Sequence, residues 1–96
     1  MTDITFLNEL FAVIRDRRKN AKPEDSYVAK TFAKGLPRIA QKVGEEAVET
    51  VIAAMKKDKK ELTSESADLL FHLLMLWEEA GLTPDDVMKE LRSRHK

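Results

Sequence analysis

Apolar side chains recur every three or four residues along most of this chain, which is the period of an amphipathic α-helix. The first such segment runs from residue 3 to about residue 19, and Asp3 or Thr2 is expected to cap its start. Its apolar positions are Ile4, Leu7, Leu10, Phe11 and Ile14. Pro23 stops any continuation, because a proline ring breaks the helical hydrogen-bond ladder. Residues 20–25 are therefore predicted to form a polar loop.

Three boundary signals divide the next stretch into a short helix and a long one. Ser26 can cap the short helix, and Gly35 supplies the left-handed backbone that often ends one. Pro37 fits the first turn of the long helix, which is predicted to run to about Lys57. Its apolar side is Ile39, Val43, Ala47, Val48, Val51, Ile52 and Met55. Gly44 costs this helix about 1 kcal/mol relative to alanine, so it is either simply tolerated or lies where a ligand or another backbone approaches.

The fourth predicted helix is apolar around most of its circumference. It follows the solvated turn Lys56–Lys60, begins near Glu61 or Ser64, and ends at Gly81. A helix that is apolar all round is buried on all sides, and a chain of 96 residues can hardly surround one. We therefore predict a subunit interface along Leu69–Trp77, and with it a homodimer or a higher oligomer.

The last helix begins with Thr83 as its cap and Pro84 in its first turn.

The length of the chain favours one domain, residues 1–96. The predicted fold is all-α: a bundle of about five helices around a central acidic helical hairpin, assembled as a homodimer.

Composition narrows the class of protein. The formal net charge is zero with 35% charged residues, so nothing favours a nucleic-acid partner or an anionic membrane. No cysteine is present, which excludes disulfides and thiolate metal sites. No apolar run approaches the ~18 residues of a membrane span, and no secretory signal pattern follows Met1. We expect a cytoplasmic protein.

Acidic residues gather in two clusters within these apolar helices. Glu45, Glu46 and Glu49 lie in the third predicted helix, and Glu65 and Asp68 lie in the fourth. Residues three or four apart share one side of a helix, and the intervening segment is long enough for a turn. The clusters can therefore face each other across a helical hairpin, where carboxylate oxygens suit Mg²⁺ or Mn²⁺.

The alternative is that these acids are simply solvated, as helix glutamates usually are. Two clusters on consecutive helices weaken that interpretation. So does the apolar neighbourhood of Asp68 in sequence, because an unpaired buried carboxylate is costly. The pattern by itself leaves both interpretations open.

The two blocks Gln41–Glu49 and Glu65–His72 resemble a known family. They read QKVGEEAVE and ESADLLFH, and they are similar to the phosphoribosyl-ATP pyrophosphohydrolases of histidine biosynthesis, within the MazG-type all-α nucleotide pyrophosphohydrolases. The signature of that superfamily is EExxE followed at a distance by ExxD. The resemblance extends from Leu10 to Arg94 and includes Ser26-Tyr27.

The resemblance implies hydrolysis of phosphoribosyl-ATP to phosphoribosyl-AMP and pyrophosphate, a small-molecule reaction that uses Mg²⁺, with Mn²⁺ as a substitute. It implies four metal ligands, Glu46, Glu49, Glu65 and Asp68. Glu45 is the candidate for orienting or deprotonating the attacking water, a catalytic role it can exchange with Glu46. Candidates for substrate phosphate binding are Lys42, Arg17 and Lys30, with Arg18 beside them. His72 shares one side of its helix with Asp68 and is a candidate for orienting a carboxylate or touching substrate, with a hydrogen-bonded core histidine as the alternative.

Two departures from the family pattern stand out. Val28 replaces a common threonine and Phe71 a common tyrosine, so each removes a hydroxyl. They put in doubt any role of those hydroxyls in substrate binding.

Two rival functions remain: a MazG-like pyrophosphohydrolase acting on other nucleoside triphosphates, and a non-catalytic helical dimerisation module.

Overall fold

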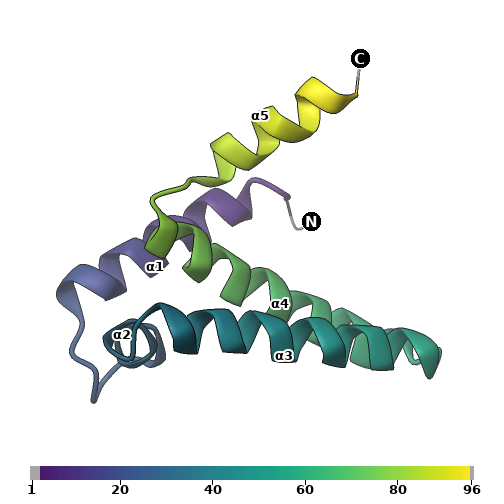
Figure 1. Cartoon of the computed structure of the whole chain (residues 1–96), viewed down its shortest axis with the longest axis horizontal. Coiled ribbons are helices and arrows are strands. Elements are labelled where there is room, and N and C mark those ends of the chain that lie inside the picture. The colour runs from purple at the N-terminus through teal and green to yellow at the C-terminus, as the bar shows by residue number, and fades with distance from the viewer. Residues whose placement is uncertain (1–2, 96) are drawn as a thin grey trace.

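The computed structural model describes residues 3–95, which form five α-helices and no β-strand. The helices are α1 (Phe6–Asn20), α2 (Tyr27–Ala33), α3 (Leu36–Met55), α4 (Lys59–Ala80) and α5 (Pro84–Arg94). Figure 1 shows α3 and α4 as a long antiparallel hairpin, with α1 and α2 at one end and α5 extending away from it. The predicted all-α class is confirmed. None of the helices in the described range is long and apolar enough to cross a membrane.

Local capping chemistry sets three of the helix ends as predicted. Ser26 caps α2, because its hydroxyl accepts a hydrogen bond from the Ala29 N–H at 3.2 Å. Thr83 caps α5 in a reciprocal pair with Asp86. Gly81 ends α4 in the left-handed region, with φ 79°. These bonds join residues close in sequence, which is why the amino-acid pattern predicts them.

Two predicted helix starts are wrong. α1 begins at Phe6 rather than residue 3: Asp3 accepts a hydrogen bond from the Thr5 N–H at 3.0 Å in the preceding turn, and Thr2 lies outside the described residues. α4 begins at Lys59, because Asp58 caps it through the Glu61 N–H at 3.0 Å. Asp58 is the one acid in the lysine-rich segment Lys56–Lys60, which the sequence predicts to be a solvated turn rather than the start of a helix.

The apolar core lies at the end of the hairpin that α1 and α2 cover. Its fully buried large side chains are Ile14, Ile39, Leu74 and Met75. Phe71, Leu76 and Trp77 pack against this cluster from α4. Other helices of the same chain cover part of Leu69–Trp77, while Leu70 stays 43% exposed, so the single chain does not bury this stretch on all sides. A subunit interface there stays a prediction.

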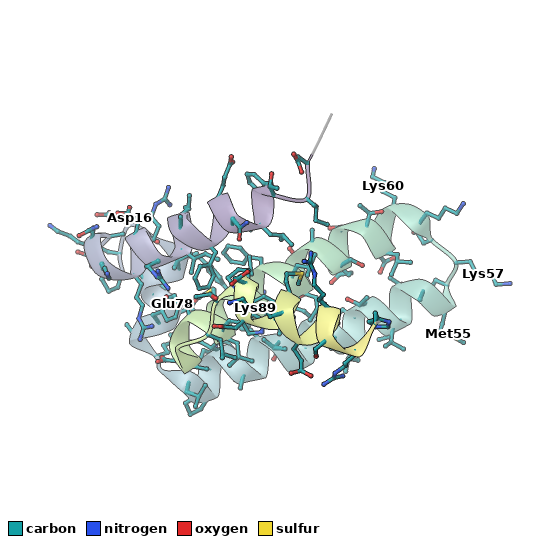
Figure 2. The ribbon with its side chains drawn as sticks, turned by 90° about the horizontal axis from the view of Figure 1, so that it is seen from above. Asp16, Met55, Lys57, Lys60, Glu78 and Lys89 are labelled. Atoms are coloured by element: carbon teal, nitrogen blue, oxygen red, sulfur yellow. The ribbon has the colours of Figure 1, made fainter. Side chains whose placement is uncertain are left out.

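The other end of the hairpin projects beyond the core. Figure 2 shows Met55, Lys57 and Lys60 at this tip. The turn there closes with Lys57 in the left-handed region, at φ 59°, and with a hydrogen bond from the Asp58 N–H to the Ala53 carbonyl at 3.4 Å. The acidic residues lie along the hairpin between the core and this tip.

Candidate metal centre

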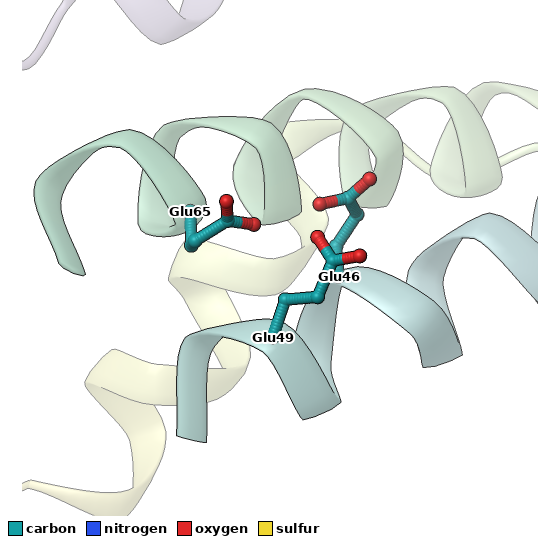
Figure 3. A group of neighbouring side chains, drawn as sticks. All are labelled: Glu46, Glu49 and Glu65. Atoms are coloured by element: carbon teal, nitrogen blue, oxygen red, sulfur yellow. The ribbon is translucent and has the colours of Figure 1, made fainter. Parts of the chain in front are cut away.

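The hairpin brings three of the predicted carboxylates together. One oxygen from each of Glu46, Glu49 and Glu65 lies within 4.8 Å of the others. Glu46 and Glu49 come from α3 and point toward α4, while Glu65 points back from α4, as Figure 3 shows. The predicted meeting of the two acidic clusters across a hairpin is thus confirmed for these three residues.

The negative charges of Glu46, Glu49 and Glu65 repel one another where the three carboxylates meet. The pKa of the Glu65 carboxyl is raised to about 7, first by its hydrogen bond with Glu49, then by burial, and then by the negative charges of Glu49, Glu46 and Asp68. One oxygen of Glu46 and one of Glu65 are buried without a hydrogen-bond partner in the described part of the chain. Buried carboxylate oxygens normally have partners, so the arrangement is built to receive positive charge.

Lys42 and Glu45 lie beside this three-carboxylate group. The Lys42 ammonium is 3.4 Å from a Glu46 oxygen and 3.5 Å from a Glu45 oxygen. Partial burial would lower the pKa of Lys42, but Tyr27 and the Glu46 and Glu45 carboxylates outweigh it and raise that pKa. Glu45 also accepts a hydrogen bond from the Gln41 amide at 3.1 Å. Lys42 therefore lies where an anionic ligand of the carboxylate site would meet a positive charge.

Asp68 lies near the group but outside the set of oxygens within 4.8 Å. Its charge contributes to the raised pKa of Glu65. The side chain is exposed rather than buried among apolar neighbours, so the burial cost used to argue for Asp68 from sequence is wrong. A role for Asp68 as a metal ligand stays a prediction.

His72 contacts none of the predicted carboxylate oxygens. Its Nδ1 lies 2.8 Å from the backbone carbonyl of Asp68, and its Nε2 lies 2.7 Å from the Tyr27 hydroxyl. His72 therefore supports Asp68 through the backbone of α4. The sequence interpretation missed Tyr27, whose only signal was its place in the Ser26-Tyr27 dipeptide, because 45 residues separate it from His72.

The basic residues of α1 and α2 have different surroundings. Arg17 and Lys30 are exposed, and neither is brought into the three-carboxylate group. Arg18 is engaged instead with α4: it contacts Glu78 at 2.9 Å and Glu79 at 3.0 Å, and it stacks over the Phe32 ring at 4.5 Å. Arg18 is therefore a structural residue that joins α1, α2 and α4.

The two departures from the family pattern have distinct surroundings. Val28 is buried in the core, so a hydroxyl at that position would face protein rather than substrate. The Phe71 ring packs against Tyr27 and His72, with centroids 6.2 Å and 5.3 Å away. Neither departure alters the three-carboxylate group.

A hard divalent cation fits the donor set. All three side chains offer oxygen, two of their oxygens are buried without partners, and their mutual repulsion falls when a cation binds. Mg²⁺ and Mn²⁺ prefer such ligands and leave room for water or phosphate oxygens. Thiolate ligation of a metal is excluded by the absence of cysteine.

Comparison with known proteins identifies the family. The family model described as phosphoribosyl-ATP pyrophosphohydrolase matches residues 7–95. The chain belongs to the phosphoribosyl-ATP pyrophosphohydrolase family. A phosphoribosyl-ATP pyrophosphatase of Azospirillum brasilense is 56% identical over 88 residues, covering 92% of this chain and 78% of that protein. One from Rhizorhabdus wittichii is 58% identical over 88 residues, covering 92% and 82%.

Some similar proteins of this family are longer. The histidine biosynthesis bifunctional protein HisIE of Vibrio cholerae is 50% identical over 95 residues, which cover 99% of this chain and 45% of that protein. The chain thus spans less than half of that bifunctional relative. As a member of this pyrophosphohydrolase family the chain is a hydrolase, and the rival interpretation as a non-catalytic module is wrong.

Proposed function

We propose that this chain hydrolyses phosphoribosyl-ATP to phosphoribosyl-AMP and pyrophosphate, as an early step of histidine biosynthesis, with Mg²⁺ held by helix carboxylates. The observation that carries the proposal is the convergence of Glu46, Glu49 and Glu65 within 4.8 Å in a chain of this family. Mg²⁺ bound there would neutralise charge on the phosphate oxygens of the substrate. Mn²⁺ is expected to substitute.

The ligand set proposed is Glu46, Glu49, Glu65 and Asp68. Glu46 and Glu65 each offer an oxygen with no partner in residues 3–95, which supports direct contact. Asp68 is exposed on the same helix as Glu65, one turn further along, and so is a candidate for contact through water. The like charges of these groups supply the attraction for the cation.

Glu45 is proposed to orient or deprotonate the attacking water, a role that Glu46 can take in exchange. The Glu45 carboxylate is exposed and anchored by Gln41 at 3.1 Å and Lys42 at 3.5 Å. Two anchors restrict its orientation while one face stays open to solvent. General-base help of this kind contributes about 10²–10⁴ in rate.

Three positively charged side chains are proposed to bind the substrate phosphates. Lys42 is the strongest candidate, because its ammonium already lies 3.4 Å from Glu46. Arg17 and Lys30 are exposed on α1 and α2, where their long side chains are available to a bound phosphate. An anionic ligand would draw Lys42 away from its carboxylate partners and strengthen their hold on a cation.

The test is release of pyrophosphate from phosphoribosyl-ATP with Mg²⁺ and with a chelator. We expect turnover only with the cation. A panel of ordinary nucleoside triphosphates separates the rival MazG-like activity, and equal turnover of ATP and phosphoribosyl-ATP would overturn the choice of substrate. The remaining expectations are a small-molecule partner, no nucleic-acid or membrane partner, a single domain and a cytoplasmic location.

We further propose a homodimer in which a second copy covers the outer face of α3. This face carries an exposed apolar stripe at helical spacing: Val48, Val51, Ile52 and Met55. A methyl group added at Gly44 would meet nothing within 4 Å, so there is room for a close helix. The radius of gyration, 14.4 Å, exceeds the value of about 12.5 Å expected for a compact domain of this length.

The proposed dimer face adjoins the carboxylate site. An open hollow of about 580 Å³ lies over Gln41, Gly44, Glu45, Val48 and Glu49, so two of the proposed site residues border the stripe. A second α3 lying in this hollow would cover apolar surface that the chain itself leaves in water.

A further inference from the structure

Tyr27 is an exposed aromatic side chain whose inner side contacts His72 and Phe71. It is the first residue of α2, and 49% of its surface is exposed. Its hydroxyl lies 2.7 Å from Nε2 of the buried His72. The His72 and Tyr27 rings are nearly perpendicular at a centroid distance of 5.7 Å, and the Phe71 ring lies 6.2 Å from the Tyr27 ring.

The hydrogen bonds of His72 determine which way the Tyr27 hydroxyl points. A backbone carbonyl only accepts hydrogen bonds, so the contact between His72 Nδ1 and the Asp68 carbonyl places a proton on Nδ1. In the neutral ring Nε2 is then an acceptor, and Tyr27 donates its proton to it. The outward side of the Tyr27 oxygen presents only lone pairs.

This polarity excludes one role for Tyr27 and favours another. An oxygen that presents lone pairs repels phosphate oxygens, so Tyr27 is unsuited to hold the polyphosphate. The Lys42 ammonium, 3.4 Å from a Glu46 oxygen, supplies the phosphate contact instead. What Tyr27 offers to a ligand is its ring, half exposed and backed by Phe71 and His72. A flat ring held in this way suits stacking on a nucleobase.

We propose that Tyr27 is the stacking platform for the purine ring of the nucleotide, and that His72 is the positioning residue that holds the platform in place. The inference rests on the proposed function, because it assigns the nucleoside end of that same substrate. The inference fixes the orientation of the bound nucleotide. Its phosphates lie toward Lys42 and the carboxylates, and its base lies over the first turn of α2.

The first test compares steady-state kinetics of Tyr27→Leu and Tyr27→Phe with phosphoribosyl-ATP. Loss of base stacking in Tyr27→Leu is expected to raise KM about 5- to 150-fold. Because the base is far from the bond that breaks, kcat should stay within about threefold. Phe6→Leu is the matched control, since Phe6 is an equally exposed aromatic residue, at 50%, on a different helix. A KM for Tyr27→Leu equal to that of the wild type would overturn the proposal.

The positioning role of His72 has its own readout. If His72 acts through the Tyr27 hydroxyl, the KM effects of His72→Leu and Tyr27→Phe will not add in the double variant. His72→Gln, which retains an acceptor for the hydroxyl, should restore most of the loss. Additive effects would instead assign His72 to the general packing of α4 and overturn its positioning role. If His72→Leu does not fold, Tyr27→Phe still tests the positioning role, because it keeps the ring and removes only the hydroxyl that meets His72, and a KM equal to that of the wild type would then overturn that role.

A second test observes the ring without turnover. The chain has a single tyrosine, so ring-¹³C tyrosine gives one set of signals. Adding AMP should shift these signals by ring current, whereas inorganic pyrophosphate should not shift them to the same extent. Ring signals unchanged by AMP would overturn the platform. If wild-type protein binds AMP at Tyr27 but does not hydrolyse phosphoribosyl-ATP, the platform stands and the proposed function fails.

Discussion

Glu49 on α3 and Glu65 on α4 face each other across the hairpin with a carboxylate oxygen of each within 4.8 Å of the other, and this neighbour is the main reason that the pKa of Glu65 is raised to about 7. Two acids placed in this way repel each other whenever both are ionised. When both acids are ionised and no cation is bound, their repulsion opposes folding, and a bound cation removes that repulsion. The same two residues therefore link stability, pH and metal binding.

Replacing Glu65 should change the pH dependence of stability. A raised carboxyl pKa means that the protonated form is favoured in the folded chain, so its stabilising contribution is full below the usual value of 4.5 and is lost as pH rises through about 7. In EDTA, Glu65→Gln should therefore melt above the wild type, and by a larger margin at about pH 8 than at about pH 5.

The measurement is thermal unfolding followed by circular dichroism at the two pH values. Glu24→Gln, in the exposed loop before α2, serves as the control that removes one carboxylate without touching the site. A margin for Glu65→Gln that does not change with pH would contradict the prediction.

Substitution of the metal ligands should separate activity from folding. Glu49→Gln and Asp68→Asn are expected to lower Mg²⁺-dependent turnover at least about 100-fold while the helical circular dichroism is retained. Mg²⁺ should raise the wild-type melting temperature, because a ligand that binds only the folded chain stabilises it, and this rise should vanish in Glu49→Gln.

Glu49→Gln and Asp68→Asn should differ in melting temperature when no metal is present. Asp68 is exposed and lies outside the 4.8 Å group, so Asp68→Asn should change the metal-free melting temperature less than Glu49→Gln does. Near-normal turnover in either variant would remove that residue from the proposed ligand set.

A charge on the outer face of α3 should prevent dimer formation. Val51 is 61% exposed within the apolar stripe, and we expect Val51→Glu to sediment as a monomer where the wild type sediments as a dimer. Val13→Glu places the same charge on α1, where the residue is 44% exposed, and should leave the dimer intact. A wild-type chain that sediments as a monomer at all accessible concentrations would refute the proposed interface.

The turn at the tip of the hairpin should become more stable with glycine at position 57. A lysine in the left-handed region costs about 1–2 kcal/mol, and glycine returns about 0.5–1 kcal/mol of that as extra entropy in the unfolded chain. Lys57→Gly should therefore raise the free energy of unfolding by about 0.5–1 kcal/mol in chemical denaturation.

Lys34 is the control for this turn. It also follows a helix, but its φ is −82°, an ordinary value for lysine. Lys34→Gly should lower the free energy of unfolding, because only the entropy term then operates. The same sign for both glycine variants would argue against strain at Lys57.

Arg17 and Arg18 are neighbours on α1, but their replacement by alanine should affect stability differently. Arg18→Ala loses ion pairs with Glu78 and Glu79 and the contact with Phe32, and should lower the free energy of unfolding by about 1–2 kcal/mol. Arg17→Ala should leave stability unchanged and raise KM for phosphoribosyl-ATP. Denaturation curves and steady-state kinetics on both variants check this pair, and an equal stability loss in both would contradict it.

Much of the local structure was readable from single residues. The caps Ser26 and Thr83 and the terminating Gly81 were predicted because each acts within a few residues of its own position. The prediction failed at Asp58, a cap hidden among lysines, and at the burial of Asp68. Exposure depends on how the hairpin is rotated, and the helical period does not determine that.

The amino-acid sequence by itself determined the set of helices, the approximate hairpin and the chemistry of its acidic residues. Helix formation and capping are interactions between near neighbours, and the oxygen donors follow from residue type. Only the tertiary structure decided that Glu46, Glu49 and Glu65 converge while Asp68 stays outside, and that Arg18 is bound to α4. It alone joined Tyr27 to His72. These pairings depend on the register and rotation of helices packed against each other, which the packing of the whole core sets.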